Sequence, residues 1–322
     1  MTAASDLLDV ALATAARGWP VIPLVPGGKR PALHGIDHCA STGVCAGGHQ
    51  GWEQRATCDP QRIRRAWSTG PFNVGIACGP AGLVVIDLDT IDPDDPEDVP
   101  PAKWMQLGIT SGADVLAVLA ERAGQPMPAT RTVDTPSGGR HLYFLAPDGP
   151  AAPALRNTSG ARGNGLGWKI DTRAHGGQVV AAGSRTPDGV YRLVDAREPV
   201  PLPGWLLQRL RPAPPPPIPA GPVHTGHGRR ARYLAAAITA ETARVHNAAA
   251  GQRNACLYVA SVALGQLVAG GTLPEADARA ALISAAGRHL ALRAYSPRQA
   301  EQTITSGLRA GARRPRRVED AA

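Results

Sequence analysis

The amino-acid sequence predicts an α/β (α+β) domain followed by a small all-α bundle. Short β-rich runs separated by Gly- and Pro-rich turns recur through the first two thirds of the chain. The stretch RPAPPPPIPAGP at 211–222 is typical of a stiff polyproline linker. Beyond it the chain is Ala-rich with helical periodicity. We therefore expect a first domain over 1–210, a linker over 211–228, and a helical domain with a basic tail over 229–322.

The composition describes a basic, soluble globular chain. Its 322 residues carry a formal net charge of +8 and the pI is near 9.7, which favours a polyanionic partner. The sequence contains no apolar run long enough to span a membrane and no secretory leader pattern. We therefore expect a cytoplasmic protein without membrane association. In that compartment the 5 cysteines should bind metal or pack in a core, because disulfides are rare there.

Capping and turn signals delimit the elements of the first domain. Helices are predicted at 7–16, at 60–67 after a cap at Asp59 or Thr57, and at 111–124. The β-rich runs 130–135 and 140–145 flank a Gly-Gly turn and predict a hairpin. Mixed and antiparallel sheets are the expected result.

The strand Leu83–Asp89 combines five apolar residues with two carboxylates near its end. Residues i and i+2 of a strand share a face, so Asp87 and Asp89 should project the same way, roughly 6–7 Å apart. A divalent cation would remove their mutual repulsion and gain hard oxygen ligands. The alternative is an edge strand whose outer face is wet.

The turn Ser137-Gly138-Gly139 offers backbone N–H groups that a phosphate could approach without obstruction by a Cβ. His141 follows this turn by two residues and is a candidate phosphate contact, although a strand histidine is more often structural. Its expected face is that of Tyr143, with Leu142 and Phe144 on the other.

A third strand, Trp168–Thr172, also carries a carboxylate near its end. Asp171 repeats the pattern of Asp87, and Arg173 should lie on the face of Asp171. A Gly-rich turn near the N-terminus carries Lys29 and Arg30, which are candidates for nucleic-acid or phosphate contact. An exposed turn without function is an equally good interpretation of those two residues.

Residues 34–58 hold three histidines and three cysteines but few apolar side chains. Such a segment cannot fold on its own core, whereas four thiolate or imidazole ligands around Zn²⁺ would order it. Cys39, Cys45 and His49 are three candidate ligands, and the fourth is His34 or, as the alternative, Cys58. A flexible loop with unpaired thiols is the competing interpretation.

In order, Asp87-Leu88-Asp89, Ser137-Gly-Gly-Arg-His141 and Ile170-Asp171 resemble the three motifs of archaeo-eukaryotic-type primases. The closer likeness is to the bifunctional primase–polymerase (Prim-Pol) domain of plasmids, phages and other mobile elements. It covers about residues 7–210, and the helices beyond 251 resemble the module that often follows that domain. The resemblance implies a DNA primase/DNA polymerase, a nucleotidyltransferase that makes or extends primers on single-stranded DNA from NTPs or dNTPs. Because the sequence lacks a Walker A motif, the implied helicase partner is a separate protein.

Position by position, the resemblance implies that Asp87, Asp89 and Asp171 bind two Mg²⁺ or Mn²⁺ ions. It also implies a site for the triphosphate of the incoming nucleotide, formed by Ser137, Gly138, Gly139, Arg140 and His141. His141 would also belong to the catalytic residues. Arg173 would add charge or contact the template. Gly183-Ser184 departs from the Pro-Pro-Ser form expected in the family, so Ser184 is a nucleotide contact of less defined role. A metal-bound insertion can occur in this part of the family's domain, which supports zinc at 34–58.

Two other classes of function compete with this one. Val84–Thr90 also fits the first motif of haloacid-dehalogenase-like phosphatases, with Asp87 as nucleophile and Asp89 as acid/base. Those enzymes need a later lysine and an acidic pair, which are not evident in the sequence. The other alternative is a non-catalytic DNA-binding replication protein, which would gain nothing from three clustered carboxylates facing a polyanion.

Overall fold

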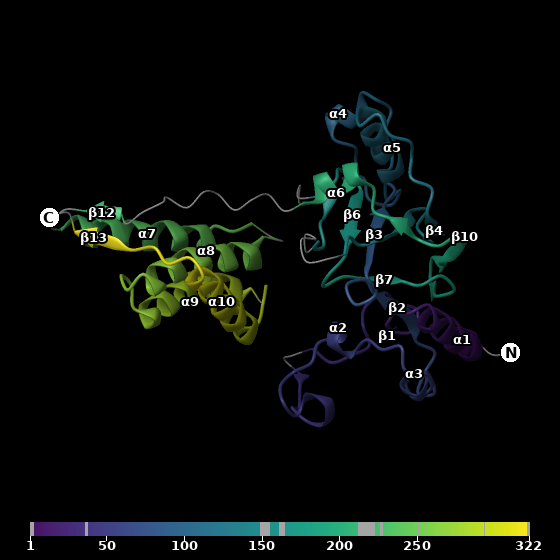
Figure 1. Cartoon of the computed structure of the whole chain (residues 1–322), viewed down its shortest axis with the longest axis horizontal. Helices are drawn as coiled ribbons and strands as arrows, with labels where there is room; N and C mark the ends of the chain where they lie inside the picture. The colour runs from purple at the N-terminus through teal and green to yellow at the C-terminus, as the bar shows by residue number, and fades with distance from the viewer. Residues whose placement is uncertain are drawn as a thin grey trace. The chain divides into compact units, whose positions relative to one another are not determined.

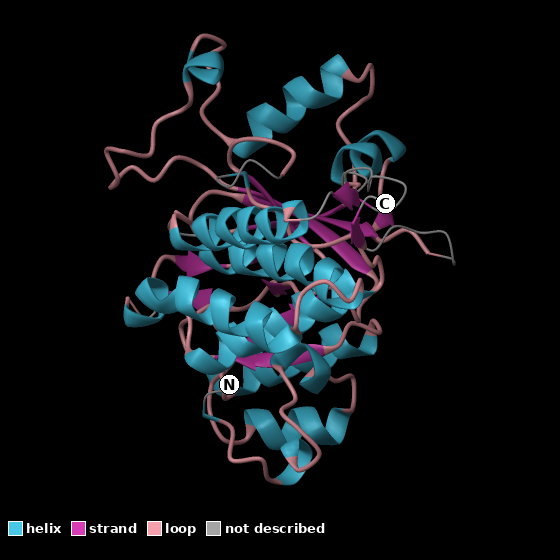
Figure 2. Ribbon diagram, turned by 90° about the vertical axis from the view of Figure 1, so that its left-hand side faces the viewer, coloured by secondary structure: helices cyan, strands magenta, loops and turns pink. Residues whose placement is uncertain are grey.

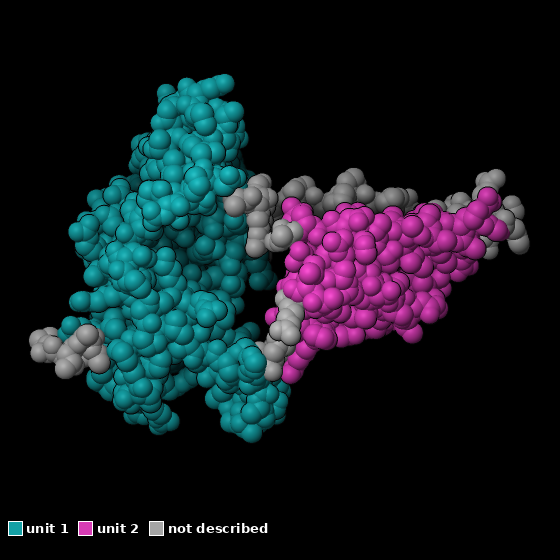
Figure 3. Space-filling model, turned by 180° about the vertical axis from the view of Figure 1, so that it is seen from behind, with its two compact units in different colours: residues 1–213 teal, residues 214–322 magenta. Residues whose placement is uncertain are grey.

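The computed structural model describes residues 3–35, 38–148, 155–160, 165–211, 223–225, 228–249, 252–292 and 294–320. The chain divides into two compact units, Met1–Ala213 and Pro214–Ala322, coloured separately in Figure 3. Unit 1 is mixed α/β with mainly antiparallel sheets and unit 2 is mainly helical. Figure 2 colours the helices and strands of the whole chain. The predicted fold class is therefore confirmed. Most of the predicted linker lies outside the described residues.

The smaller sheet of unit 1 has three antiparallel strands in the order β1-β2-β7. They are β1 (Val21–Leu24), β2 (Asn73–Ala77) and β7 (Gln178–Val180). Helices α1 (Ala3–Ala16) and α3 (Pro60–Trp67) pack against this sheet through a shared apolar core. The Asp59 carboxylate accepts hydrogen bonds from the backbone N–H groups that begin α3, which confirms one of the two predicted caps.

The larger sheet places β3 between two antiparallel neighbours. Its strand order is β10-β4-β5-β3-β6, and β11 joins β5 in parallel. The strands are β3 (Leu83–Leu88), β4 (Arg131–Asp134), β5 (Arg140–Leu145), β6 (Ile170–Arg173), β10 (Arg192–Asp195) and β11 (Val200–Pro201). Strands β4 and β5 form the predicted hairpin.

Both faces of the larger sheet are covered, which explains why β3 is apolar on both sides. Val84, Ile86 and Leu88 pack against helices on one face. These helices are α4 (Ala102–Met105), α5 (Gly112–Arg122) and α6 (Gly204–Leu210). Val85 and Tyr143 pack in the core shared with the smaller sheet. Figure 1 shows α4 to α6 at one end of unit 1, α1 and α3 at the other, and β3 between them.

The segment 34–58 has little regular structure. It contains a short 3₁₀ turn, η2 (Gly43–Cys45), and one helical turn, α2 (Trp52–Arg55). At its end, Val21 and Thr57 exchange backbone hydrogen bonds of 3.0 and 3.1 Å, so the segment returns to the edge of β1. Later in unit 1, β8 (Arg185–Thr186) and β9 (Gly189–Val190) form a small separate hairpin.

In the described part of unit 2, four helices surround one apolar core, and the helical bundle predicted from the Ala-rich pattern is present. The helices are α7 (Arg229–His246), α8 (Arg253–Ala269), α9 (Glu275–Ala291) and α10 (Pro297–Ala312). Strands β12 (Val223–Thr225) and β13 (Val318–Asp320) pair in parallel. In the basic tail, Arg316 donates hydrogen bonds to Gln266 at 2.9 Å and to Tyr233 at 3.2 Å, so this part of the tail packs on α7 and α8.

Within the described ranges, every helix is too short or too polar to cross a membrane.

Candidate active site and candidate metal centre

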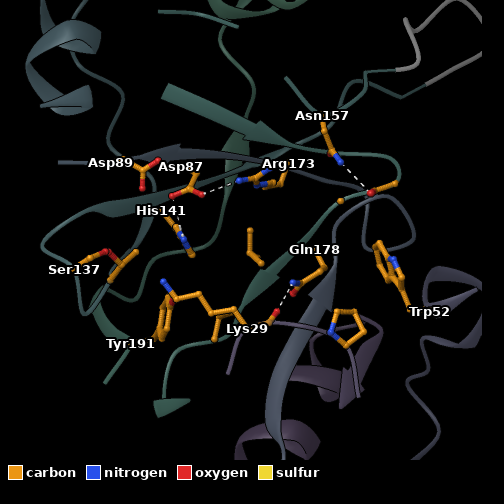
Figure 4. Close-up of a pocket in the computed structure, with 16 residues that line it drawn as sticks. Lys29, Trp52, Asp87, Asp89, Ser137, His141, Asn157, Arg173, Gln178 and Tyr191 are labelled. Atoms are coloured by element: carbon orange, nitrogen blue, oxygen red, sulfur yellow. Dashed lines mark hydrogen bonds and ion pairs between the residues drawn. The ribbon is translucent and has the colours of Figure 1, made fainter. Parts of the chain in front are cut away.

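Four predicted site residues come together on the face of the larger sheet that is turned toward the smaller one. Asp87 on β3 is paired with His141 on β5 and with Asp171 on β6. Residues directly opposite each other in antiparallel strands have Cβ atoms about 4.5–5.5 Å apart. His141 Nε2 lies 3.4 Å from the Asp87 carboxylate. Asp89 follows the last residue of β3, and Figure 4 shows its side chain beside that of Asp87.

Arg173 on β6 brings positive charge to two of the three carboxylates. Its Nη2 atom lies 2.9 Å from the Asp171 carboxylate and 3.6 Å from that of Asp87. The alternation of side chains along β6 places Arg173 on the face of Asp171, as predicted. The backbone N–H of Gly160 also donates to Asp171, at 3.0 Å. These contacts let Asp87 and Asp171 lie on neighbouring strands in spite of their like charges.

The carboxylates of Asp87 and Asp89 differ in pKa. Burial acts to raise the pKa of Asp87, but the hydrogen bond and charge of His141, together with Arg173, outweigh it and lower the pKa below the ordinary value. Burial, reinforced by the charges of Asp87 and Asp171, raises the pKa of Asp89 to about 6. Among the described residues the Asp89 carboxylate has no hydrogen-bond or ion-pair partner. A divalent cation with oxygen ligands would fit this uncompensated charge.

Asp87, Asp89, His141 and Arg173 line a cavity of about 470 Å³ whose walls come from both sheets of unit 1, and Asp171 contacts Arg173 without lining it. The larger sheet contributes Asp87, His141 and Arg173, and the opposite wall includes Lys29 and Gln178. His141 is buried, and its Nδ1 atom has no hydrogen-bond partner in the described part of the chain. The cavity thus has a carboxylate-rich surface next to groups that can donate to an anion, which is the environment that a metal–phosphate ligand requires.

The turn before β5 fixes Ser137 at the rim of this cavity. Gly138 has φ +82°, in the left-handed region that favours glycine. A Cβ on Gly139 would lie only 2.5 Å from the Leu88 carbonyl oxygen, so the turn approaches the end of β3 closely. The Thr90 hydroxyl donates to the Ser137 carbonyl at 2.9 Å. Ser137 itself lines the cavity.

Three predicted residues lie elsewhere. Arg140 donates to the Asp134 carboxylate at 2.9 Å, and strand alternation directs it to the sheet face opposite His141. Ser184 is fully buried, and its hydroxyl accepts from the Val74 backbone N–H at 3.0 Å, which gives it a structural role beside β2. Of the two basic residues on the N-terminal turn, Lys29 lines the cavity and Arg30 does not.

The cavity also has lining residues that the sequence interpretation did not identify. Trp52, Asn157 and Tyr191 are the main ones. Asn157 bridges the turn after β6, because its side chain donates to the Gly176 carbonyl and accepts from the Ala174 N–H, each at 2.9 Å. Trp52 belongs to the segment 34–58, where the cysteines and histidines directed attention to metal. One large aromatic side chain in a segment otherwise poor in apolar residues was the available signal.

The segment 34–58 brings four potential metal ligands together. One ligand atom from each of His34, Cys39, Cys45 and His49 lies within 4.8 Å of the others. This is the first of the two predicted ligand sets. Cys58, the alternative, is outside the group and packs against the core of the smaller sheet. Two thiols and two imidazoles at such separations fit a tetrahedral Zn²⁺ site.

Contacts around the four residues are consistent with that fit. Cys45 is buried, and its Sγ lies 3.6 Å from His34 Nε2 and accepts from the Gln50 N–H at 3.4 Å. His49 Nδ1 is buried without a hydrogen-bond partner among the described residues. Coordination to a metal would satisfy such an atom.

A cavity with clustered carboxylates, a histidine and a Gly-rich turn is typical of enzymes that handle phosphate groups with divalent cations. The sequence matches the family described as bifunctional DNA primase/polymerase, N-terminal (Prim-Pol), over residues 11–205. No curated protein matches the chain. The matched range contains both sheets and the whole cavity, and the chain belongs to the bifunctional DNA primase/polymerase family.

Proposed function

We propose that the protein is a template-directed nucleotidyltransferase that makes or extends primers on single-stranded DNA. The observation that carries this proposal is the convergence of Asp87, Asp89, Asp171 and His141 on one sheet face, inside the range matched by the Prim-Pol family. Family membership supports this activity over a phosphatase. The carboxylate cluster supports a catalytic role over simple DNA binding, because carboxylates repel a polyanion.

In this proposal Asp87, Asp89 and Asp171 would hold two Mg²⁺ or Mn²⁺ ions. Once bound, the ions would activate the 3′-hydroxyl of the primer and stabilise charge on the pyrophosphate that leaves. His141 and Arg173 orient the carboxylates of Asp87 and Asp171 through the contacts described above. The Asp89 carboxylate supports the assignment, because it has no partner among the described residues and a cation would supply one.

The incoming NTP or dNTP would place its triphosphate between the Ser137 turn and His141. Ser137 lies at the cavity rim and His141 lines the cavity, so both are placed beside a phosphate bound there. Arg140 contributes its backbone to this turn and not its side chain. Lys29, on the opposite wall, supplies a further positive charge. The net charge of +8 favours association with the DNA template, and a separate helicase would supply the single strand.

A gel-based extension assay tests the activity. The full chain with Mn²⁺ should lengthen a labelled primer on a single-stranded template when dNTPs are added, and chelation of the divalent metal should stop it. A parallel reaction with p-nitrophenyl phosphate should release no nitrophenol. Hydrolysis of the ester without any extension would support the phosphatase alternative, and template binding with neither activity would support the non-catalytic one. Omitting the primer distinguishes de novo synthesis from extension.

We also propose that the cluster of His34, Cys39, Cys45 and His49 binds a structural Zn²⁺ ion. Metal analysis of the purified protein should find about one zinc per chain, as for a closed four-ligand site. Cys45→Ser should lose the zinc, because Cys45 is the buried thiol of the cluster. Cys58→Ser is the matched control and should retain it. Zinc retained by Cys45→Ser and lost from Cys58→Ser would contradict this ligand set.

A further inference from the structure

Trp52 lies in the cavity wall at the end remote from the Ser137 turn. Figure 4 shows Ser137 and Asp89 at one end of the group of lining residues and Trp52 at the other, with Arg173 and Lys29 between them. Trp52 is partly buried, packs against the core of the smaller sheet and lines the cavity. The two ends therefore differ chemically. One end offers carboxylates, a histidine and a Gly-rich turn, and the other offers a flat aromatic surface.

The position of Trp52 is set by contacts on both sides of it in the chain. Three residues before it, His49 is part of the His/Cys cluster, and the Gln50 N–H donates to Cys45 Sγ. Directly after it, the Glu53 carboxylate accepts a hydrogen bond of 2.8 Å from the Gly176 N–H, in the turn that follows β6. Trp52 is thus fixed between the cluster and a turn that itself lines the cavity.

We propose that Trp52 is the platform on which the base of the incoming nucleotide stacks, and that the His/Cys cluster sets the position of this platform. The inference rests on the proposed polymerase function and adds the base subsite to it. With the triphosphate at the end that carries Ser137 and Asp89, a nucleotide that extends through the cavity places its base at the Trp52 end. A volume of about 470 Å³ lies in the range of small-molecule sites.

An aromatic platform suits a templated enzyme because every base has a π-face, so stacking stabilises each base without selecting among them. Selection is then left to pairing with the template. The nearby Asn157 amide is held in place by the backbone of residues 174–176, because its nitrogen donates to Gly176 and its oxygen accepts from Ala174.

Calorimetric titration of the full, metal-loaded chain without primer tests the platform. Two probes are compared, dATP and inorganic tripolyphosphate, which lacks the base. Trp52→Ala should weaken dATP binding by roughly 5- to 150-fold, the range expected for loss of one base–aromatic stack. Its affinity for tripolyphosphate should be unchanged. Trp52→Phe keeps an aromatic ring and should restore most of the dATP affinity. Trp205→Ala is the matched control, since Trp205 is partly buried against the core on the opposite sheet face.

The role of the cluster is tested with the same two probes. Cys45→Ser should weaken dATP more than tripolyphosphate, as Trp52→Ala does, and adding Cys45→Ser to Trp52→Ala should produce little further loss. Equal loss of both probes in Trp52→Ala would mean that Trp52 only supports the fold, which overturns the proposal. Unchanged dATP binding, or weaker binding of a single-stranded oligonucleotide in place of dATP, would also overturn it. If the wild type binds dATP through Trp52 but never extends a primer, the proposed function fails and the base subsite stands.

Discussion

Asp87→Asn should reduce the rate of primer extension by at least about a thousandfold. Asp87 is the central member of the site, paired with His141 on one side and with Asp171 on the other. The amide has nearly the same volume but lacks the charge, so a metal ligand is lost while packing is kept. Metal ions supply several kcal/mol of transition-state stabilisation, and about 4 kcal/mol corresponds to a thousandfold in rate. The measurement is the initial rate of dNTP incorporation on a primed template.

The matched control for this substitution is Asp9→Asn, because Asp9 is exposed on α1 and remote in sequence from the cavity residues. It should extend primers at the wild-type rate. Asp87→Asn should also keep its affinity for single-stranded DNA within about twofold, because a carboxylate contributes nothing favourable to phosphate binding. Full extension by Asp87→Asn would contradict the assignment of the site, whereas loss of both extension and circular dichroism would show only that the variant is unfolded.

Asp89→Asn should stabilise the metal-free protein at pH 8. The pKa of Asp89 is raised to about 6 in the folded state, against roughly 3.9 in an unfolded chain. The folded state therefore holds its proton more tightly, and stability falls as the pH rises from about 4 through 6. Above that window the ionised carboxylate costs on the order of 2–3 kcal/mol, as an upper limit. The asparagine variant removes this cost, and urea denaturation in a chelating buffer at pH 5 and pH 8 measures it.

Asp87→Asn serves as the comparison, because ionisation of Asp87 affects stability in the opposite direction. The pKa of the Asp87 carboxyl group is lowered in the folded state. The ionised form therefore stabilises the fold above the unfolded pKa, and this contribution is lost as the pH falls. At pH 8 Asp87→Asn should destabilise the metal-free protein while Asp89→Asn stabilises it. If both substitutions shifted stability in the same direction, the opposite pKa shifts assigned to Asp87 and Asp89 would be wrong.

The arrangement of the carboxylates could be predicted because it depends on local rules. Alternation along a strand put Asp171 and Arg173 on one face, and the hairpin signal at Gly138-Gly139 predicted that β5 would carry His141 away from a turn. The same rule places Arg140 on the other side of the sheet, because Arg140 lies next to His141 in sequence. Arg140 and His141 are neighbours in one motif, which suggested that both side chains contact the triphosphate. Because successive side chains of a strand point to opposite faces, the two side chains do not share a face.

The position of Trp52 and the choice of the fourth metal ligand depend on contacts between residues that are far apart in the sequence. Trp52 reaches the cavity because the segment 34–58 returns to β1 at Thr57 and because Glu53 binds the turn at Gly176. Neither contact has a local signature. The same return explains the choice of the fourth metal ligand, since pairing of Thr57 with Val21 carries Cys58 into the core and leaves His34 to complete the cluster.

The three central side chains of the site are each carried by a different strand, and interstrand hydrogen bonds set their spacing. Neighbouring strands are about 4.8 Å apart in any sheet, so strand pairing fixes the spacing of these three side chains across the site. The connection from β5 to β6 adds to this framework, because its Gly160 N–H donates to Asp171 and its Asn157 lines the cavity. A one-residue slip of β6 against β3 would turn Asp171 to the far side of the sheet. Engineering of this protein should thus keep the alignment of β6 against β3 fixed.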